Sequence, residues 1–534
     1  MEFAPLAEKI VDAILESDPV AASYAGDHRF DHRLPDLSTD GVAADVSMLR
    51  DAAHALSQVD ADTLDLADRV DHEILSSIVD REVFERADLR EHEWNPLVHN
   101  PGALLHALMS RPFAPVEQRL ESLAMRLEAV PDALATARTL LDGCPQIHLE
   151  TAVGQFQGAA ELIRDQVPPM LAQVPGLEPI VGPAADRAVT ALEEFSGWLG
   201  RQRPARDPRL GRKLFEARLW HTLDTELSAA EVLERAEANL ERVSEEIREA
   251  ALQVVGGSTS NNQVVREALR TLSDQHPAND TIMGLARRTL DETTEFVRAG
   301  ELVTLVDDVC VLEEMPEFAR GVAVAYCDSP GPLETADVAT FYCIAPTPRD
   351  WSAELVESFY QEYNDHMVRN LTVHEAMPGH YLQLAHARRY RGATRVRALG
   401  ASGPFIEGWA VYAEEVMADQ GFGGLPVRMQ QLKMQLRMTI NAILDQLVHC
   451  EGLVEQDAMA LMTERGFQEQ GEAAGKWPRT LLTSTQLSTY FVGWAEVSAI
   501  GRARPAGTPL RQWHDAMLAQ GSPAPRHLRT LLSL

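Results

Sequence analysis

The sequence predicts a mostly α-helical fold with a small sheet of about three strands. Apolar residues recur at helical spacing through most of the 534-residue chain. Short β-branched or aromatic runs, bounded by Pro, Gly and Asp, are concentrated between residues 301 and 346. Hydrophobic residues make up 45% of the chain, which is enough for a sizeable buried core.

The first half of the chain is predicted to form stacked helices. Leu120, Leu123, Leu127 and Val130 are spaced so that they lie on one apolar helical face. Similar patterns cover residues 5–17, 43–58, 63–88, 150–176, 185–201 and 228–254. Residues 255–262 are expected to form a surface loop and residues 201–209 a second hinge.

Three stretches are predicted strands: VTLVDDVCVLEE (303–314), GVAVAYC (321–327) and ATFYCIAP (339–346). Helical patterns resume near residue 350 and continue to the last residue. The predicted sheet therefore directly precedes the stretch that carries the chemistry described below.

Charge and cysteine content exclude several classes of protein. The chain has 48 Lys and Arg against 80 Asp and Glu, and a net charge of −32, so it should repel nucleic acids. Five cysteines without a CxxC pair do not indicate a disulfide framework and fit a reducing cytoplasm. The acidic N-terminus does not resemble a signal peptide, and no apolar run approaches about 18–20 residues. We therefore expect a cytoplasmic protein without a membrane partner, and a homodimer is compatible with the sequence.

The stretch LTVHEAMPGHYLQLAH, residues 371–386, indicates a metal site. A catalytic zinc typically takes three protein ligands and leaves one position for water. His374 and Glu375 match the first half of the HExxH pattern, in which the glutamate is the general base. The second histidine of that pattern would stand at position 378, but Pro378 is there and the next histidine is His380.

The spacing of six residues needs a special local structure. Along a straight helix, six residues rotate by about 600°, or about 240° net, so the two histidines would face different directions. Pro378 and Gly379 lie between them; proline interrupts a helix, and glycine permits unusual backbone geometry. We therefore predict a bulge or widened turn that returns His380 towards His374.

The third ligand is expected to be an acid on the next helix. Glu407 lies one turn after the Gly403-Pro404 break in apolar surroundings, where a carboxylate needs a partner or a metal. Glu414 lies seven residues later on the same face, where it can accept a hydrogen bond from a ligating histidine. His386 is a rival ligand, although no catalytic acid is next to it.

With these residues identified, HEAMPGHYLQ followed by EGWAVYAEE resembles the bacterial family named domain of unknown function 885. The resemblance extends over nearly the whole chain, through ASYAGDHRFDHRLPDLS, RMTINAILDQLVHCEG and STYFVGWAEV. It implies the helical, cleft-containing zincin-like fold of the carboxypeptidase Taq group of zinc peptidases, whose third ligand is a glutamate. It also implies one Zn²⁺ per chain, held by His374, His380 and Glu407, with Glu375 as general base.

Further residues are candidates for supporting roles. Tyr490 is a candidate donor to the oxyanion, with an ordinary core tyrosine as the alternative. Arg437, Asp445 and His449 face broadly one side of a long helix. Arg437 could bind a substrate carboxylate, His449 could donate to the oxyanion and Asp445 could orient a metal ligand, or all three could form a buried structural network. The strand ATFYCIAP is expected to form the edge of the cleft, where an extended peptide could bind by adding a strand to the sheet. Tyr342 would then lie near the substrate.

These observations predict a zinc-dependent hydrolase that cleaves amide bonds of peptides or peptide-like small molecules. A metal-dependent hydrolase or lyase acting on a non-peptide metabolite is an alternative, and a non-enzymatic helical scaffold is another. We expect one catalytic unit over residues 1–534. Residues 1–300 would form its mainly helical N-terminal part, and residues 301–534 would hold the small sheet and the metal-binding helices.

Overall fold

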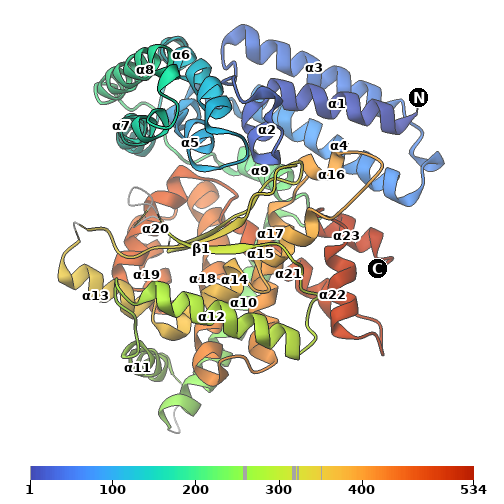
Figure 1. Ribbon diagram of the computed structural model, residues 1–534. Coiled ribbons are helices and arrows are strands. Elements are labelled where there is room, and N and C mark those ends of the chain that lie inside the picture. Colours follow the sequence, from blue (N-terminus) through green and yellow to red (C-terminus); the bar gives the residue numbers. More distant parts are fainter. Residues whose placement is uncertain (1, 257–260, 316–319, 321–323, 350) are drawn as a thin grey trace. The chain divides into compact units, whose positions relative to one another are not determined.

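The computed structural model describes residues 2–256, 261–315, 320, 324–349 and 351–534, and it contains two compact units (Figure 1). The first unit comprises Met1–Pro208, Pro330–Val338 and Gly392–Gly400, and the second comprises Arg209–Ser329, Ala339–Arg391 and Ala401–Leu534. The first unit thus ends inside the hinge predicted at 201–209. Part of the predicted loop at 255–262, residues 257–260, lies outside the described residues. Whether the two units act as one catalytic unit stays a prediction.

The first unit is helical, and its core lies among α5, α6, α7 and α8. The predicted apolar face of α6 is confirmed, since Leu120, Leu123, Leu127 and Val130 are fully buried. The helices of this unit are α1 (Phe3–Ser17), α2 (Pro19–Ala25), α3 (Thr39–Ser57), α4 (Leu66–Phe84), α5 (Gly102–Ser110), α6 (Val116–Leu140), α7 (Gln146–Leu171), α8 (Glu178–Leu199) and α16 (Val396–Leu399).

The second unit contains the remaining α-helices and the sheet. Its helices are α9 (Arg212–Leu223), α10 (Ala229–Val255), α11 (Asn262–Ser273), α12 (Ile282–Ala299), α13 (Ala353–Glu362), α14 (Asp365–Glu375), α15 (His380–Ala387), α17 (Gly403–Asp419), α18 (Gly424–Gln446), α19 (Glu455–Ala460), α20 (Gln470–Leu482), α21 (Ser488–Arg502), α22 (Leu510–Leu518) and α23 (Pro525–Leu531). Within the described part of the chain, the helices are too short or too polar to cross a membrane.

The sheet has three strands, β1 (Cys310–Glu314), β2 (Ala325–Asp328) and β3 (Thr340–Ile344), in the order β1-β3-β2. β1 runs parallel to β3, and β2 runs antiparallel to it. The predicted helical fold with a small sheet is therefore confirmed, although residues 321–323 of the second predicted stretch lie outside the described residues. Since β3 is the central strand, the prediction that ATFYCIAP forms an exposed sheet edge is wrong.

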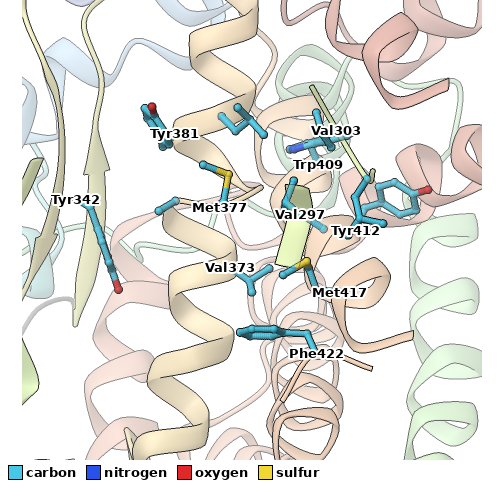
Figure 2. Close-up of a cluster of buried hydrophobic side chains, with 14 of the residues drawn as sticks. Val297, Val303, Tyr342, Val373, Met377, Tyr381, Trp409, Tyr412, Met417 and Phe422 are labelled. Atoms are coloured by element: carbon cyan, nitrogen blue, oxygen red, sulfur yellow. The ribbon is translucent and has the colours of Figure 1, made fainter. Parts of the chain in front are cut away.

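A buried apolar cluster lies directly beside the HE stretch. Figure 2 shows Val373 and Met377, which flank the end of α14, with Tyr381 of α15 and Trp409 of α17 in the same cluster. All four are at most 5% exposed. Burial of these side chains holds the three helices together at the point where the candidate ligands lie.

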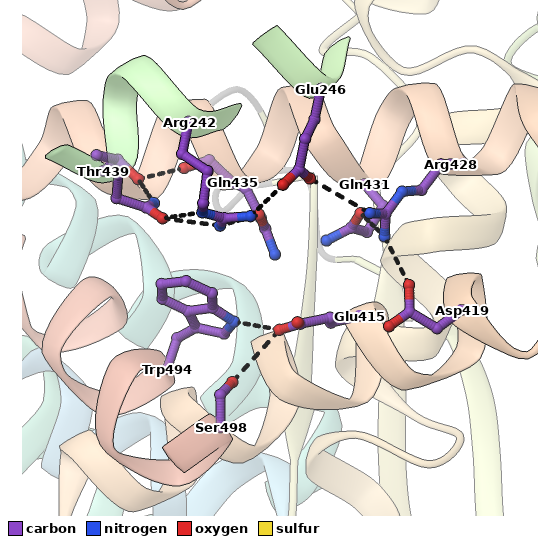
Figure 3. A network of polar contacts seen from close by, with 11 residues as sticks. Arg242, Glu246, Glu415, Asp419, Arg428, Gln431, Gln435, Thr439, Trp494 and Ser498 are labelled. Carbon is purple, nitrogen blue, oxygen red and sulfur yellow. Dashed lines mark hydrogen bonds and ion pairs between the residues drawn. The ribbon is translucent and has the colours of Figure 1, made fainter. Parts of the chain in front are cut away.

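A polar network fixes the other side of α17 (Figure 3). Trp494 Nε1 and Ser498 Oγ of α21 donate hydrogen bonds of 2.6 and 3.3 Å to Glu415 Oε2. Arg428 of α18 donates to Asp419 Oδ1 at 3.0 Å. α17 is therefore tied to α21 and α18 independently of the residues that face the HE stretch.

Candidate metal centre

Three helices bring His374, His380 and Glu407 together. His374 is in the last turn of α14, His380 is the first residue of α15, and Glu407 lies in the first turns of α17. Their ligand atoms lie within 4.8 Å of one another. Glu407 Oε2 is 3.5 Å from His374 Nε2 and 3.4 Å from His380 Nε2. No other such group of His, Cys, Asp or Glu occurs in the described ranges.

A widened turn accounts for the spacing of six. α14 ends at Glu375 and α15 begins at His380, so the helix is interrupted between the two histidines. Across the interruption, the N–H of Gly379 donates to the carbonyl of Val373, six residues earlier, at 2.9 Å. A regular α-helix makes this bond over four residues. The turn therefore absorbs two additional residues and lets His380 return to the side of His374.

Only glycine fits at position 379 of this turn. A Cβ added to Gly379 would lie 1.9 Å from the carbonyl oxygen of His374 and 2.4 Å from that of Val373. Both are backbone atoms, which cannot move without changing the turn itself. From the other side, Trp409 Nε1 donates a buried 2.9 Å hydrogen bond to the carbonyl of Pro378.

α17 approaches α21 closely because two glycines face each other. A Cβ on Gly408 would lie 2.3 Å from the backbone of Gly493, and a Cβ on Gly493 would lie 2.1 Å from the carbonyl oxygen of Pro404. Gly408 follows Glu407 directly in sequence. The close contact between helices thus sets the position of the carboxylate.

The chemistry of these side chains fits a zinc ion. Two imidazoles and one carboxylate form a common ligand set for catalytic zinc. Glu407 Oε2 is buried, yet it has no hydrogen-bond partner among the described residues. Burial opposes ionisation of Glu407, but the charge of His380 and contacts with both histidines hold its pKa well below the usual value. A buried, ionised oxygen between two imidazole nitrogens is the arrangement that a cation would satisfy.

Of the two candidate histidine ligands that Glu414 was expected to contact, His374 is the one within hydrogen-bond distance. His374 Nδ1 lies 2.7 Å from Glu414 Oε1, and Asn370 Nδ2 donates to Glu414 Oε2 at 2.5 Å. With its Nδ1 bound to the carboxylate, His374 presents Nε2 to Glu407. Sequence reasoning did not find Asn370, although its position four residues before His374 on α14 places both on one helix face.

Substitution of Glu414 with Gln should weaken zinc binding by about 10- to 100-fold. A carboxylate can accept from both His374 and Asn370, whereas an amide has only one acceptor oxygen. Zinc affinity is measured by competition with a chromophoric chelator. Glu415→Gln is the matched control, because both of its hydrogen bonds are accepted by a single oxygen that the amide retains. Equal affinities for the two variants would contradict the role of Glu414.

Glu375 is the last residue of α14, and its side chain contacts the sheet. It is 8% exposed, and its carboxylate accepts a hydrogen bond from the backbone of Cys327 in β2. Burial raises the pKa of Glu375; the charges of His374 and His380 oppose this, and that of Glu407 adds to it. A carboxylate whose pKa is raised towards the working pH is suited to proton transfer.

Tyr490 of α21 lies near the same centre. The negative charge of Glu407 is the largest cause that raises the pKa of the Tyr490 hydroxyl, and burial adds to it. Gln486 Nε2 donates to Tyr490 Oη at 3.4 Å. The hydroxyl therefore keeps its proton at neutral pH and stays a candidate donor.

The predicted group of Arg437, Asp445 and His449 does not join the candidate metal ligands. Arg437 and Asp445 lie on α18, and His449 lies in the turn Leu447–Glu451 that follows it. His449 Nε2 lies 2.9 Å from the carbonyls of both Thr480 and Thr483, and its Nδ1 lies 3.4 Å from the Leu210 N–H. Both ring nitrogens are occupied by backbone groups, so we no longer assign His449 to catalysis. The sequence could not show this, because these partners are far away along the chain.

Asp445 stabilises α21 instead of orienting a metal ligand. It is fully buried and accepts hydrogen bonds from the Thr485 N–H at 2.9 Å and the Ser488 N–H at 3.0 Å. Ser488 Oγ also donates to it at 2.7 Å. These groups stand at the N-terminus of α21, where a negative charge is favourable.

The side chains of Arg437 and Tyr342 also have their partners inside the protein. Arg437 pairs with Glu472 and donates to Tyr363 Oη at 3.3 Å, which corrects its assignment to a substrate carboxylate. Tyr342 is fully buried, and its hydroxyl lies 3.0 Å from Thr372 Oγ1. A side chain without exposed surface cannot touch substrate, so its predicted role is withdrawn.

Among the solved structures that match the chain are two that cover nearly the full length of both proteins. One is described as a "putative lipoprotein of unknown function" from Shewanella oneidensis, with 27% identity, 100% of both chains covered and a TM-score of 0.84. The other is described as a "putative lipoprotein" from Colwellia psychrerythraea, with 15% identity, 99% and 98% coverage and a TM-score of 0.81. Because both are described as lipoproteins, the predicted cytoplasmic location is contradicted.

A more distant match is an M32 carboxypeptidase from Deinococcus radiodurans R1, with 13% identity, 93% and 95% coverage and a TM-score of 0.38. No curated protein matches the chain. The profile of the family described as "Bacterial protein of unknown function (DUF885)" matches residues 19–532. This match covers almost the whole sequence and includes every residue of the candidate metal centre. The chain therefore belongs to the bacterial family named domain of unknown function 885 (DUF885).

Proposed function

We propose that this protein is a zinc-dependent hydrolase that cleaves amide bonds of peptides or peptide-like small molecules. The observation that carries the proposal is the convergence of His374, His380 and Glu407 within 4.8 Å, with Glu375 next to the first of them. His374, His380 and Glu407 would hold one Zn²⁺, and Glu414 would orient His374. The family to which the chain belongs is described as one of unknown function, so the proposal rests on these residues.

The chain's own residues suit water-assisted cleavage of an amide. A bound Zn²⁺ would supply Lewis acidity to a substrate carbonyl and would lower the pKa of a water molecule. Glu375 takes the proton from the attacking water and passes it to the leaving amine. Tyr490 donates its O–H to the oxygen on which negative charge develops. Burial of Glu375 keeps bulk water away from the base.

Metal content tests the proposal first. We expect about one zinc per chain, measured by inductively coupled plasma mass spectrometry on protein purified without a histidine tag. His380→Ala should lose the metal, because one of three ligands is removed. His386→Ala is the matched control on the same helix, since its ring contacts the carbonyl of Thr304 at 2.7 Å and does not join the cluster.

Two results would contradict the metal site. One is the absence of metal from the parent protein even after zinc is offered. The other is equal metal content in the His380→Ala and His386→Ala variants. A protein that binds zinc is then screened against a peptide library and a set of amide-bearing metabolites, with cleavage read by mass spectrometry. Zinc binding without cleavage of any amide would contradict the proposed reaction while leaving the metal site intact.

A further inference from the structure

Lys476 of α20 has a buried side-chain amine that makes no hydrogen bond or ion pair with the described residues. The residue is 5% exposed. Burial and the positive charge of Arg437 hold the pKa of Lys476 well below the usual value, so its charged form is favoured only when an anion lies beside it. An anionic ligand would therefore supply the partner that the described residues do not.

The two carboxylates whose negative charges act on Lys476 already have other ion-pair partners. Glu472 lies one turn earlier on α20, at the usual spacing for a helical ion pair, but it is paired with Arg437. Glu362 accepts a hydrogen bond from Lys433 Nζ at 2.9 Å. Neither carboxylate forms an ion pair with Lys476, which leaves its amine without a direct contact with an acid.

Arg479 connects this part of α20 with the candidate metal centre. It lies three residues after Lys476 on α20, on the same side of the helix. Arg479 Nη2 donates to Gln486 Oε1 at 3.0 Å, and Gln486 Nε2 donates to Tyr490 Oη at 3.4 Å. Tyr490 in turn is close enough to Glu407 for the negative charge of that carboxylate to raise the pKa of the tyrosine. A continuous series of contacts thus connects the guanidinium with the candidate oxyanion donor.

The local balance of charge is opposite to that of the chain. The whole protein has a net charge of −32, yet basic residues outnumber acidic ones by four to two in this cluster. Its members are the basic residues Lys433, Arg437, Lys476 and Arg479 and the carboxylates Glu362 and Glu472. Such a surplus within an acidic protein attracts an anion to one side of the site.

We infer that Lys476 and Arg479 bind a carboxylate of the substrate, on the side of the metal centre where Tyr490 lies. The inference rests on the proposed hydrolase function and adds the class of substrate. Arg479 is exposed and can make a bidentate contact with a carboxylate, and Lys476, protonated in the presence of the anion, can donate to the same group. The carboxylate can be the C-terminal group of a peptide or an acidic side chain.

Binding to the zinc-loaded full-length Glu375→Gln protein tests the inference without turnover. Fluorescently labelled peptides are compared in matched pairs, as a free C-terminal acid against its amide and as Asp or Glu against Asn or Gln. We expect at least one acid form to bind about 10-fold more tightly than its neutral partner, measured by fluorescence anisotropy. The pair that shows the difference identifies the source of the carboxylate.

Variants assign the difference to the two cations. Lys476→Met and Arg479→Gln, each added to Glu375→Gln, should reduce the preference for the acid to less than about threefold. Arg502→Gln, an exposed arginine at the end of α21, is the control and should retain it. Zinc content is measured for every variant, and Arg479→Gln covers the case in which the buried Lys476→Met variant does not fold.

Equal affinity for acid and neutral peptides would overturn the inference, as would a preference that persists in the Arg479→Gln variant. These outcomes are separable from failure of the proposed function. If acid peptides bind selectively but the parent protein cleaves none of them, the binding inference holds and the hydrolase proposal fails. If the parent cleaves neutral amides as efficiently as acids, the hydrolase proposal holds and the carboxylate site is wrong.

Discussion

Glu375→Gln should reduce turnover by at least about 10²- to 10⁴-fold while the protein keeps its zinc. The glutamine has the size of the glutamate, but it cannot take a proton from water. Glu375 is not one of the three converging ligands, so its charge is not needed to hold the metal. The rate is measured on the best substrate from the peptide screen, and zinc is measured by mass spectrometry on the same samples.

The control for this variant is Glu354→Gln, an exposed glutamate in the first turn of α13. It should keep both activity and zinc. Full activity in Glu375→Gln would show that another group is the base. Loss of zinc from Glu375→Gln would mean instead that the carboxylate supports the metal directly.

Gly379→Ala should abolish zinc binding and lower the melting temperature. The added Cβ would lie 1.9 Å from the carbonyl oxygen of His374, a distance that real Cβ atoms do not show. The widened turn must then open, which moves His374 and His380 apart. Because the clash is with backbone, a change of rotamer cannot relieve it. Zinc stoichiometry and thermal unfolding by circular dichroism measure the two effects.

Gly154→Ala in α7 is the matched control, since nothing lies within 4 Å of the Cβ that it would add. Alanine is more favourable than glycine inside a helix by about 1 kcal/mol, so this variant should be equally or more stable. A Gly379→Ala protein that keeps one zinc per chain would disprove the steric argument. It would imply that the turn adapts without separating the histidines.

The residues of the candidate metal centre could be proposed from sequence because their spacing is short. His374, Glu375 and His380 lie within seven residues, and two local rules relate them: helix rotation and the interrupting Pro378-Gly379 pair. Glu407 could be added by one further inference, because it is an acid in apolar surroundings on the next predicted helix. The α6 face and the three strands were also predictable, since they depend on local periodicity.

The predictions that failed depend on contacts between distant parts of the chain. Arg437 faces Glu472, and the ring of His449 faces carbonyls of residues 480 and 483. Tyr342 was expected at a sheet edge, but β1 and β2 flank its strand on both sides. No local pattern in the sequence indicates which of several polar residues on a helix will find a partner tens of residues away.

By itself, the sequence determined a helical chain with a small sheet and a histidine-glutamate motif interrupted by Pro-Gly. Tertiary structure alone decided that Gly379 lies against the carbonyl of His374, that Asn370 and Glu414 orient this histidine, and that Lys476 is left without a partner. Periodicity and spacing are properties of neighbouring residues, which backbone geometry relates directly. Hydrogen bonds and burial of charge arise only when separate helices pack together, so they follow from the complete fold.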